Sequence, residues 1–135
     1  MRRLLFALAV AAAPAMAAAA EPAKGSPPAT LLISPLPLPV VQDGRLVNYV
    51  YVNLRLTLSP TADADKLREK EPFFRDALVR TAHRVRLAPP KDNNTIDEAR
   101  LRAVILAQAA RIAGPGKVTG VQLLRADPQH HVSNP

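Results

Sequence analysis

The sequence predicts an α+β fold, in which helices pack on one face of a small, largely antiparallel sheet. Two periodicities lead to this class. Apolar and other side chains alternate along 46–58, which is typical of a strand with one buried face. Apolar residues recur at helical spacing within 63–112, and a short apolar run follows at 118–124. We therefore expect the order strand, strand, broken helix, helix, strand.

The segment 1–20 has the features of an export signal. Arg2 and Arg3 precede an apolar run that ends in small residues with Ala-x-Ala cleavage sites. The apolar stretch covers about 17 residues, mostly alanine, which is the lower limit for crossing a bilayer. We interpret 1–20 as a signal peptide, and the alternative is a retained weak anchor. The remainder is then periplasmic, or anchored in the inner membrane and facing the periplasm.

A linker and an edge strand are expected next. The segment 21–34 begins with Pro, Ala and Gly residues that lack apolar periodicity, and we predict a flexible linker. A single domain is expected over 35–128. Prolines alternate with apolar residues along 35–40, a pattern that excludes a helix and fits an edge strand or an extended arm. Asp43-Gly44 is a turn pair between two extended runs.

The main strand is predicted to have two different faces. Leu46 begins the face expected to meet the core, which also includes Asn48. Tyr49 and Tyr51 lie on the other face. They either cover the sheet or form a subunit contact, since tyrosine is enriched in interfaces.

The helical region is predicted to begin near Asp63, and either Thr61 or Asp63 can cap it. Pro72 should divide it into two helices or kink a single one. Residues at helical spacing after this break define the face expected to be buried. They are Phe74, Ala77, Leu78, Thr81 and Val85.

The last helix is expected to start from a capping box. Thr95 and Glu98 have the required spacing, so the helix is predicted from Ile96 to about Ile112. Gly114 and Pro115 then stop it. The final strand 118–124 precedes a polar tail at 129–135.

Three segments together resemble a known family. They are the strand Tyr49–Leu54, the helix segment Pro72–Leu78 with its Arg-Asp pair, and the last helix followed by the terminal strand Val118–Leu124. In this order they look like the periplasmic domain of the FliL family, the flagellar basal-body-associated proteins. The resemblance covers roughly 36–126. It implies a stomatin-like domain that self-associates around the motor's stator units, supports motility and is not an enzyme.

The chain departs from the family pattern at both ends. It lacks a cytoplasmic head and a firm transmembrane helix, and the final strand ends in Arg125-Ala126-Asp127-Pro128. Without an anchor, such a protein would have to be recruited to its complex. A paralogue with a different task is therefore an alternative to a stator-linked role.

No catalytic or cofactor motif is present, and we expect neither a cofactor nor a metal. The chain has no cysteine, which excludes disulfides and thiol chemistry. His83 is predicted to lie on a helix surface, and His130-His131 lies in the polar tail. The formal charge is +7, but aromatic residues do not interleave with the basic ones, so nucleic acid is not an expected partner.

Arginines cluster in the second helical piece, at Arg75, Arg80, Arg84 and Arg86. They form either a solvated basic face or a docking face for an acidic partner or anionic lipid heads. The sequence thus favours an exported, non-enzymatic protein-interaction module with partners in the cell envelope. The alternative is a periplasmic module that binds an anionic ligand or lipid surface. The candidate contact residues are Tyr49, Tyr51, Arg75, Arg80 and Arg84.

Overall fold

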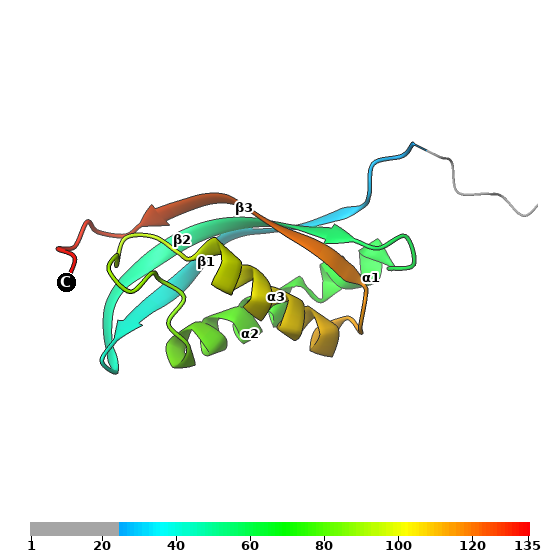
Figure 1. The fold of residues 1–135 in the computed structure, drawn as a ribbon. Coiled ribbons are helices and arrows are strands. Elements are labelled where there is room, and N and C mark those ends of the chain that lie inside the picture. Colours follow the sequence, from blue (N-terminus) through cyan, green and yellow to red (C-terminus); the bar gives the residue numbers. More distant parts are fainter. Residues whose placement is uncertain (1–24) are drawn as a thin grey trace, which may run out of the picture.

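A computed structural model describes residues 25–135, so the expected signal or anchor at 1–20 lies outside the described residues. The α+β class is confirmed, because three antiparallel strands form one sheet with helices against one of its faces (Figure 1). The elements are β1 (Thr30–Gln42), β2 (Arg45–Leu58), α1 (Ala64–Glu69), α2 (Glu71–Arg84), α3 (Glu98–Ile112) and β3 (Val118–Pro128).

The sheet has the order β1-β2-β3, with β2 in the centre. A tight turn joins β1 to β2, as predicted, and Asp43 and Gly44 both have positive φ there, at 49° and 73°. These values suit the turns that match the twist of a β-hairpin. The apolar faces of all three strands meet α2 and α3 in one core, in which Phe74 and Ile105 are fully buried.

The prediction of a flexible linker over 21–34 was wrong for its last residues, 30–34. β1 begins at Thr30, and within it Leu31 and Ile33 are 3% and 0% exposed. They pair with Leu56 and Leu54 of β2. Residues 30–34 are therefore strand, because alternate apolar side chains enter the core before the first proline of the strand.

The prolines of β1 lie on the sheet face that carries no helix. Pro37 is the register partner of Tyr51, and Pro39 is the partner of Tyr49. Between them Leu38 points into the core and is fully buried. A proline cannot donate to a strand ladder, so its place is on an edge strand such as β1.

Leu46 was predicted to face the core, but it is 49% exposed. The register between β1 and β2 changes here: Val40 pairs with Asn48, whereas Val41 pairs with Leu46. One extra residue in β2 reverses the faces of the strand, since side chains alternate with a period of two. Asn48 keeps the predicted inward position and is 5% exposed.

The helical region divides before Pro72, as expected. Asp63 caps α1 by accepting a hydrogen bond from the Lys66 N–H at 3.1 Å, and Lys70 separates α1 from α2. Val85 was wrongly assigned to the buried face. The helix ends at Arg84, and Val85 has an extended backbone and is 42% exposed. The buried side chains of α2 are Phe74, Leu78 and Ala82.

The cap of α3 is Asp97 and not Thr95. The Asp97 carboxylate accepts a hydrogen bond from the Arg100 N–H at 3.0 Å. Ile96 precedes the helix and is 5% exposed, so its side chain is buried in the core before the helix begins. The Asp97 N–H bonds the Leu87 carbonyl at 2.8 Å, which sets the entry into the helix.

The polar tail is held against the fold. The Asn48 side chain donates to the His130 carbonyl at 2.8 Å and to the Asn93 carbonyl at 3.1 Å. Asn94 exchanges two hydrogen bonds with the backbone of Val132, at 2.8 and 3.0 Å. The Asn134 side-chain oxygen accepts hydrogen bonds from the Asn93 N–H at 3.0 Å and from the Asn94 side-chain amide at 3.1 Å. We call the residues joined here the C-terminal clamp; they are Asn48, Asn93, Asn94, His130, Val132 and Asn134.

Candidate interaction groove

Helices α2 and α3 lie side by side and run in opposite directions (Figure 1). Lys70, before α2, bonds the carbonyl of Ile112 at the end of α3, and Gln108 bonds Thr81 midway along. On the solvent side the two helices leave a hollow of about 300 Å³, which we call the α2–α3 groove. The lining side chains that concern its chemistry are Phe73, Asp76, Arg80, Arg84, Gln108 and Arg111.

One arginine of the groove is paired with an acid. Arg80 donates to Asp76 through Nε at 3.0 Å and through Nη2, and their side chains are 68% and 53% exposed. These hydrogen bonds to Asp76 raise the pKa of Arg80 above its ordinary value. An ion pair as exposed as this one contributes little to stability, so another carboxylate can replace Asp76 at small cost.

The other two arginines have no acidic partner. Within residues 25–135, neither Arg84 nor Arg111 has a carboxylate within 4.0 Å or a side-chain hydrogen bond. Each lies in the last turn of its helix, where a positive charge suits the helix dipole. Three guanidinium groups and one carboxylate therefore give this groove an excess of positive charge.

The groove has an apolar end. Phe73 is 64% exposed, and with Lys70 and Ile112 it lines an adjoining hollow of about 250 Å³. Phe73 and Ile112 also line the α2–α3 groove, so these two side chains border both hollows. The surface thus combines an exposed aromatic ring with cations further along the same helices.

Two arginines of the predicted cluster have other roles. Arg75 donates to the Pro35 carbonyl at 2.5 Å and lies 3.5 Å from Glu71, with 32% of its side chain exposed. Arg86 donates to the carbonyl of Pro89 at 2.6 Å and to Asn93 at 2.9 Å. Both side chains fasten α2 and the following loop to neighbouring backbone. Of the predicted arginines, Arg80 and Arg84 alone line the groove.

Local sequence patterns missed Arg111 and Phe73. Arg111 is distant in sequence from the cluster in α2, and only the antiparallel packing of the helices brings it close. Phe73 stands next to the buried Phe74, and the register of the helix alone decides which of the two rings faces solvent. That register indicates an outward Phe73, because Phe74 begins the buried stripe.

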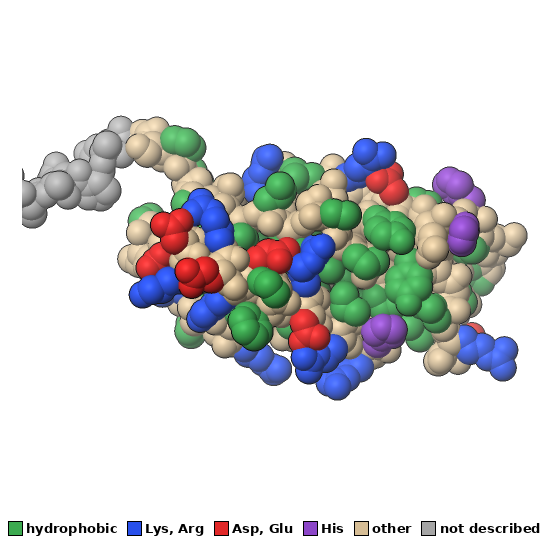
Figure 2. Space-filling view, turned by 180° about the vertical axis from the view of Figure 1, so that it is seen from behind, with side chains coloured by type: hydrophobic (Ala, Val, Ile, Leu, Met, Phe, Trp, Pro, Cys, Tyr) green, Lys and Arg blue, Asp and Glu red, His purple; other side chains and the backbone are tan. Residues whose placement is uncertain are grey.

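The two tyrosines lie on the sheet face that has no helix. Tyr51 is 39% exposed, and Tyr49 is half-buried opposite the buried Pro39. Figure 2 views the molecule from behind and shows hydrophobic side chains gathered between the histidines. The tyrosines cover the sheet together with the prolines of β1, and Tyr51 remains available for contact.

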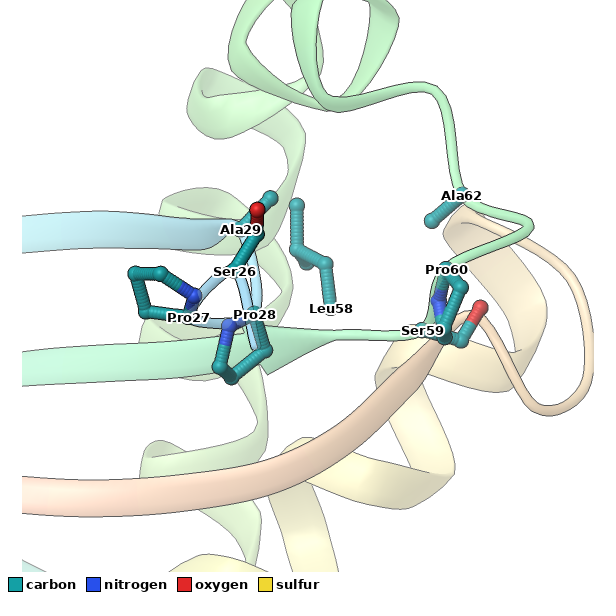
Figure 3. A pocket seen from close by; sticks show the side chains of 8 residues that line it. All are labelled: Ser26, Pro27, Pro28, Ala29, Leu58, Ser59, Pro60 and Ala62. Atoms are coloured by element: carbon teal, nitrogen blue, oxygen red, sulfur yellow. The ribbon is translucent and has the colours of Figure 1, made fainter. Parts of the chain in front are cut away.

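A further hollow lies where the N-terminal segment reaches the sheet (Figure 3). It measures about 340 Å³, and residues 26–29 face the end of β2 and the turn after it across this space. Its lining holds no titratable side chain; the polar side chains are the hydroxyls of Ser26 and Ser59. Ser59 is already hydrogen-bonded to Thr61 at 3.0 Å. Within residues 25–135, no acid or base lines this hollow that could activate either hydroxyl.

Metal-ligating and membrane-spanning features are not found in the described part of the chain. No three His, Cys, Asp or Glu side chains of residues 25–135 lie together in a way that could hold a metal ion. No helix between these limits is long and apolar enough to cross a bilayer. His83, His130 and His131 are all exposed.

Comparison of the chain with protein-family models, with curated proteins and with solved structures gives no match. The chemistry of the surface is therefore the basis for its interpretation. Guanidinium groups recognise carboxylates and phosphates, and an exposed phenyl ring binds apolar side chains. The α2–α3 groove combines both properties on a rigid pair of helices.

Proposed function

We propose that the protein is an exported, non-enzymatic module that binds a protein partner in the cell envelope. The observation that carries the proposal is the α2–α3 groove, where Arg84 and Arg111 have no acidic partner among residues 25–135 and an exposed Phe73 lines the same hollow. Arginine and aromatic residues are enriched among the residues that dominate protein interfaces. Two of the arginines predicted from the sequence, Arg80 and Arg84, line this groove together with Arg111 of α3.

The proposal includes a FliL-like domain with a stomatin-like fold, associated with the flagellar basal body and its stator units. Its support is the ordered set of segments that resembles this family, together with the α+β class. In this account the protein self-associates and reaches the periplasm through segment 1–20. If that segment is cleaved, the partner recruits the protein; if it is retained, the protein faces the periplasm from the inner membrane.

Gene deletion tests the motor assignment. We expect reduced spreading in soft agar in a flagellated host, with recovery when the intact gene is restored. Unchanged swimming, or an organism without flagella, would exclude the motor role. Mass spectrometry and membrane fractionation of the native protein would show whether segment 1–20 is removed.

Binding of an anionic ligand or lipid surface is the second candidate function. The three arginines of the groove, Arg80, Arg84 and Arg111, favour this function, since phosphate groups also bind guanidinium. Titration of the protein with phosphatidylglycerol vesicles and acidic wall fragments, at low and high salt, tests this function. Salt-sensitive binding is expected, and absent or salt-insensitive binding would exclude it.

A further inference from the structure

We propose that the α2–α3 groove binds an acidic amphipathic helix of the partner, with one apolar anchor and two carboxylates one turn apart. The inference rests on the proposed function, because it specifies the chemistry of the partner that the groove accepts. It follows from the spacing and charge of side chains on α2 and α3. A helix laid in a groove between two others is a common mode of peptide recognition.

The spacing of the side chains on α2 defines the pattern. Arg80 and Arg84 are four residues apart, which places them one turn apart, about 6 Å along the helix. Phe73 is seven residues before Arg80, about 10.5 Å along the same stripe. A partner helix that lies along α2 would match this stripe with an apolar residue followed, seven and eleven residues further, by carboxylates.

The charges favour an acidic occupant. Arg80, Arg84 and Arg111 line the groove with a single acid, Asp76, so the lining carries an excess of two positive charges. Arg111 approaches from α3, so it faces the same space from the opposite wall. A carboxylate at either Arg84 or Arg111 would pair a cation that has no acidic partner in residues 25–135.

The chain's own N-terminal segment does not have this chemistry. Residues 1–20 contain Arg2 and Arg3 and no acidic residue. A flat lipid surface also suits the site less well, since the arginines line a concave space between two helices. Helix α2 has 14 residues, about 21 Å, which is room for about four turns of a partner helix.

Two synthetic peptides of equal composition test the spacing. The first is an alanine- and glutamine-based helix with leucine at position 2 and glutamates at positions 9 and 13. In the second, the glutamates are moved to the opposite helix face. The protein is the full gene product in the form that accumulates in the cell, and binding is followed by fluorescence anisotropy. We expect the first peptide to bind at least about fivefold more tightly than the second.

Variants of the groove test the contacts. Arg84→Ala and Arg111→Ala should each weaken binding by about two- to fivefold, the range of an exposed ion pair. Phe73→Ala should weaken it by about tenfold. Asp76→Asn removes the competing carboxylate and should strengthen binding by about twofold. Lys91→Ala removes a charge from the loop outside the groove and should change nothing.

Thermal unfolding of each variant shows whether the fold is intact, and Arg84→Lys keeps the charge as a further control. Equal affinity for the two peptides would overturn the inference. So would an affinity for the first peptide that none of the groove variants changes. Binding of phosphatidylglycerol vesicles through the same arginines, without binding of either peptide, would assign the groove to lipid and also overturn it. If a partner is cross-linked in cells equally well by an Arg84→Glu/Arg111→Glu variant, the proposed function stands and this inference fails. If no partner is cross-linked and swimming is unchanged, the proposed function fails.

Discussion

The Asn48 side-chain amide donates a hydrogen bond to the His130 carbonyl oxygen at 2.8 Å, which joins the inward face of β2 to the C-terminal tail. Asn48 is 5% exposed and also accepts a hydrogen bond from the Tyr49 N–H at 2.9 Å. A buried polar side chain is stable in such a place only when its donors and acceptors are bonded. The tail is therefore part of the folded domain.

Replacing Asn48 should destabilise the protein markedly. In Asn48→Ala, the carbonyls of Asn93 and His130 lose a donor, and we expect the free energy of unfolding to fall by about 1–3 kcal/mol. Asn53→Ala is the matched control, because Asn53 only accepts an exposed hydrogen bond from Ser34. It should cost less than about 0.5 kcal/mol in urea unfolding. Equal losses in the two variants would contradict this role of Asn48.

The two candidate caps of α3 can be separated by mutation. Asp97→Ala removes the side chain that accepts from the Arg100 N–H and should cost about 0.5–2 kcal/mol of unfolding free energy. Thr95→Ala removes the residue of the capping box that the sequence suggested, and should have a much smaller effect. Urea unfolding of both variants measures the difference. A larger loss in Thr95→Ala would place the cap where the sequence pattern put it.

Acid should weaken the start of α1 through Asp63. A hydrogen bond from the Lys66 N–H lowers the pKa of this carboxyl below its ordinary value of 3.8. A lowered pKa means that the ionised form contributes stability above pH 3.8, and that this contribution is lost as the pH falls through the folded-state pKa. Unfolding of the wild type should therefore depend more steeply on pH in this acid range than unfolding of Asp63→Asn. Identical pH profiles would exclude the effect.

The prolines of β1 should limit association through its free edge. Changing Pro37 and Pro39 to threonine supplies N–H donors to that edge, and unpaired edges invite pairing with other chains. We expect a larger mass in solution by light scattering than for the wild type. Pro60→Thr, which alters a proline after β2, is the control and should leave the mass unchanged. An unchanged mass in the double variant would mean that the prolines do not protect the edge.

The strands could be predicted because alternation along a strand is local. The error at Leu46 arises from an extra residue in β2 that the alternation pattern does not locate. Val85 was misplaced for a similar reason: helical spacing continues past Arg84, although the helix does not. Local periodicity predicts which side chains of a helix or strand are buried. It does not predict the residue at which the helix or strand ends.

The groove could be predicted only in part. Arg80 and Arg84 were identified from their spacing on one helix. Arg111 lines the same groove because α2 and α3 pack antiparallel. Arg75 does not line it, because its side chain donates a hydrogen bond to the Pro35 carbonyl. Both outcomes depend on tertiary contacts. The clamp was missed for the same reason, since its hydrogen bonds link residues up to 82 positions apart.

The most direct test of the account is photo-cross-linking in living cells. Benzoylphenylalanine in place of Phe73 reports on the α2–α3 groove, and in place of Tyr51 it reports on the opposite face of the sheet. We predict a discrete protein adduct from position 73 that is reduced by Arg84→Ala and Arg111→Ala. An adduct from position 51 alone, or none from position 73 under conditions in which the protein is exported and folded, would contradict the claim that the protein works through this groove.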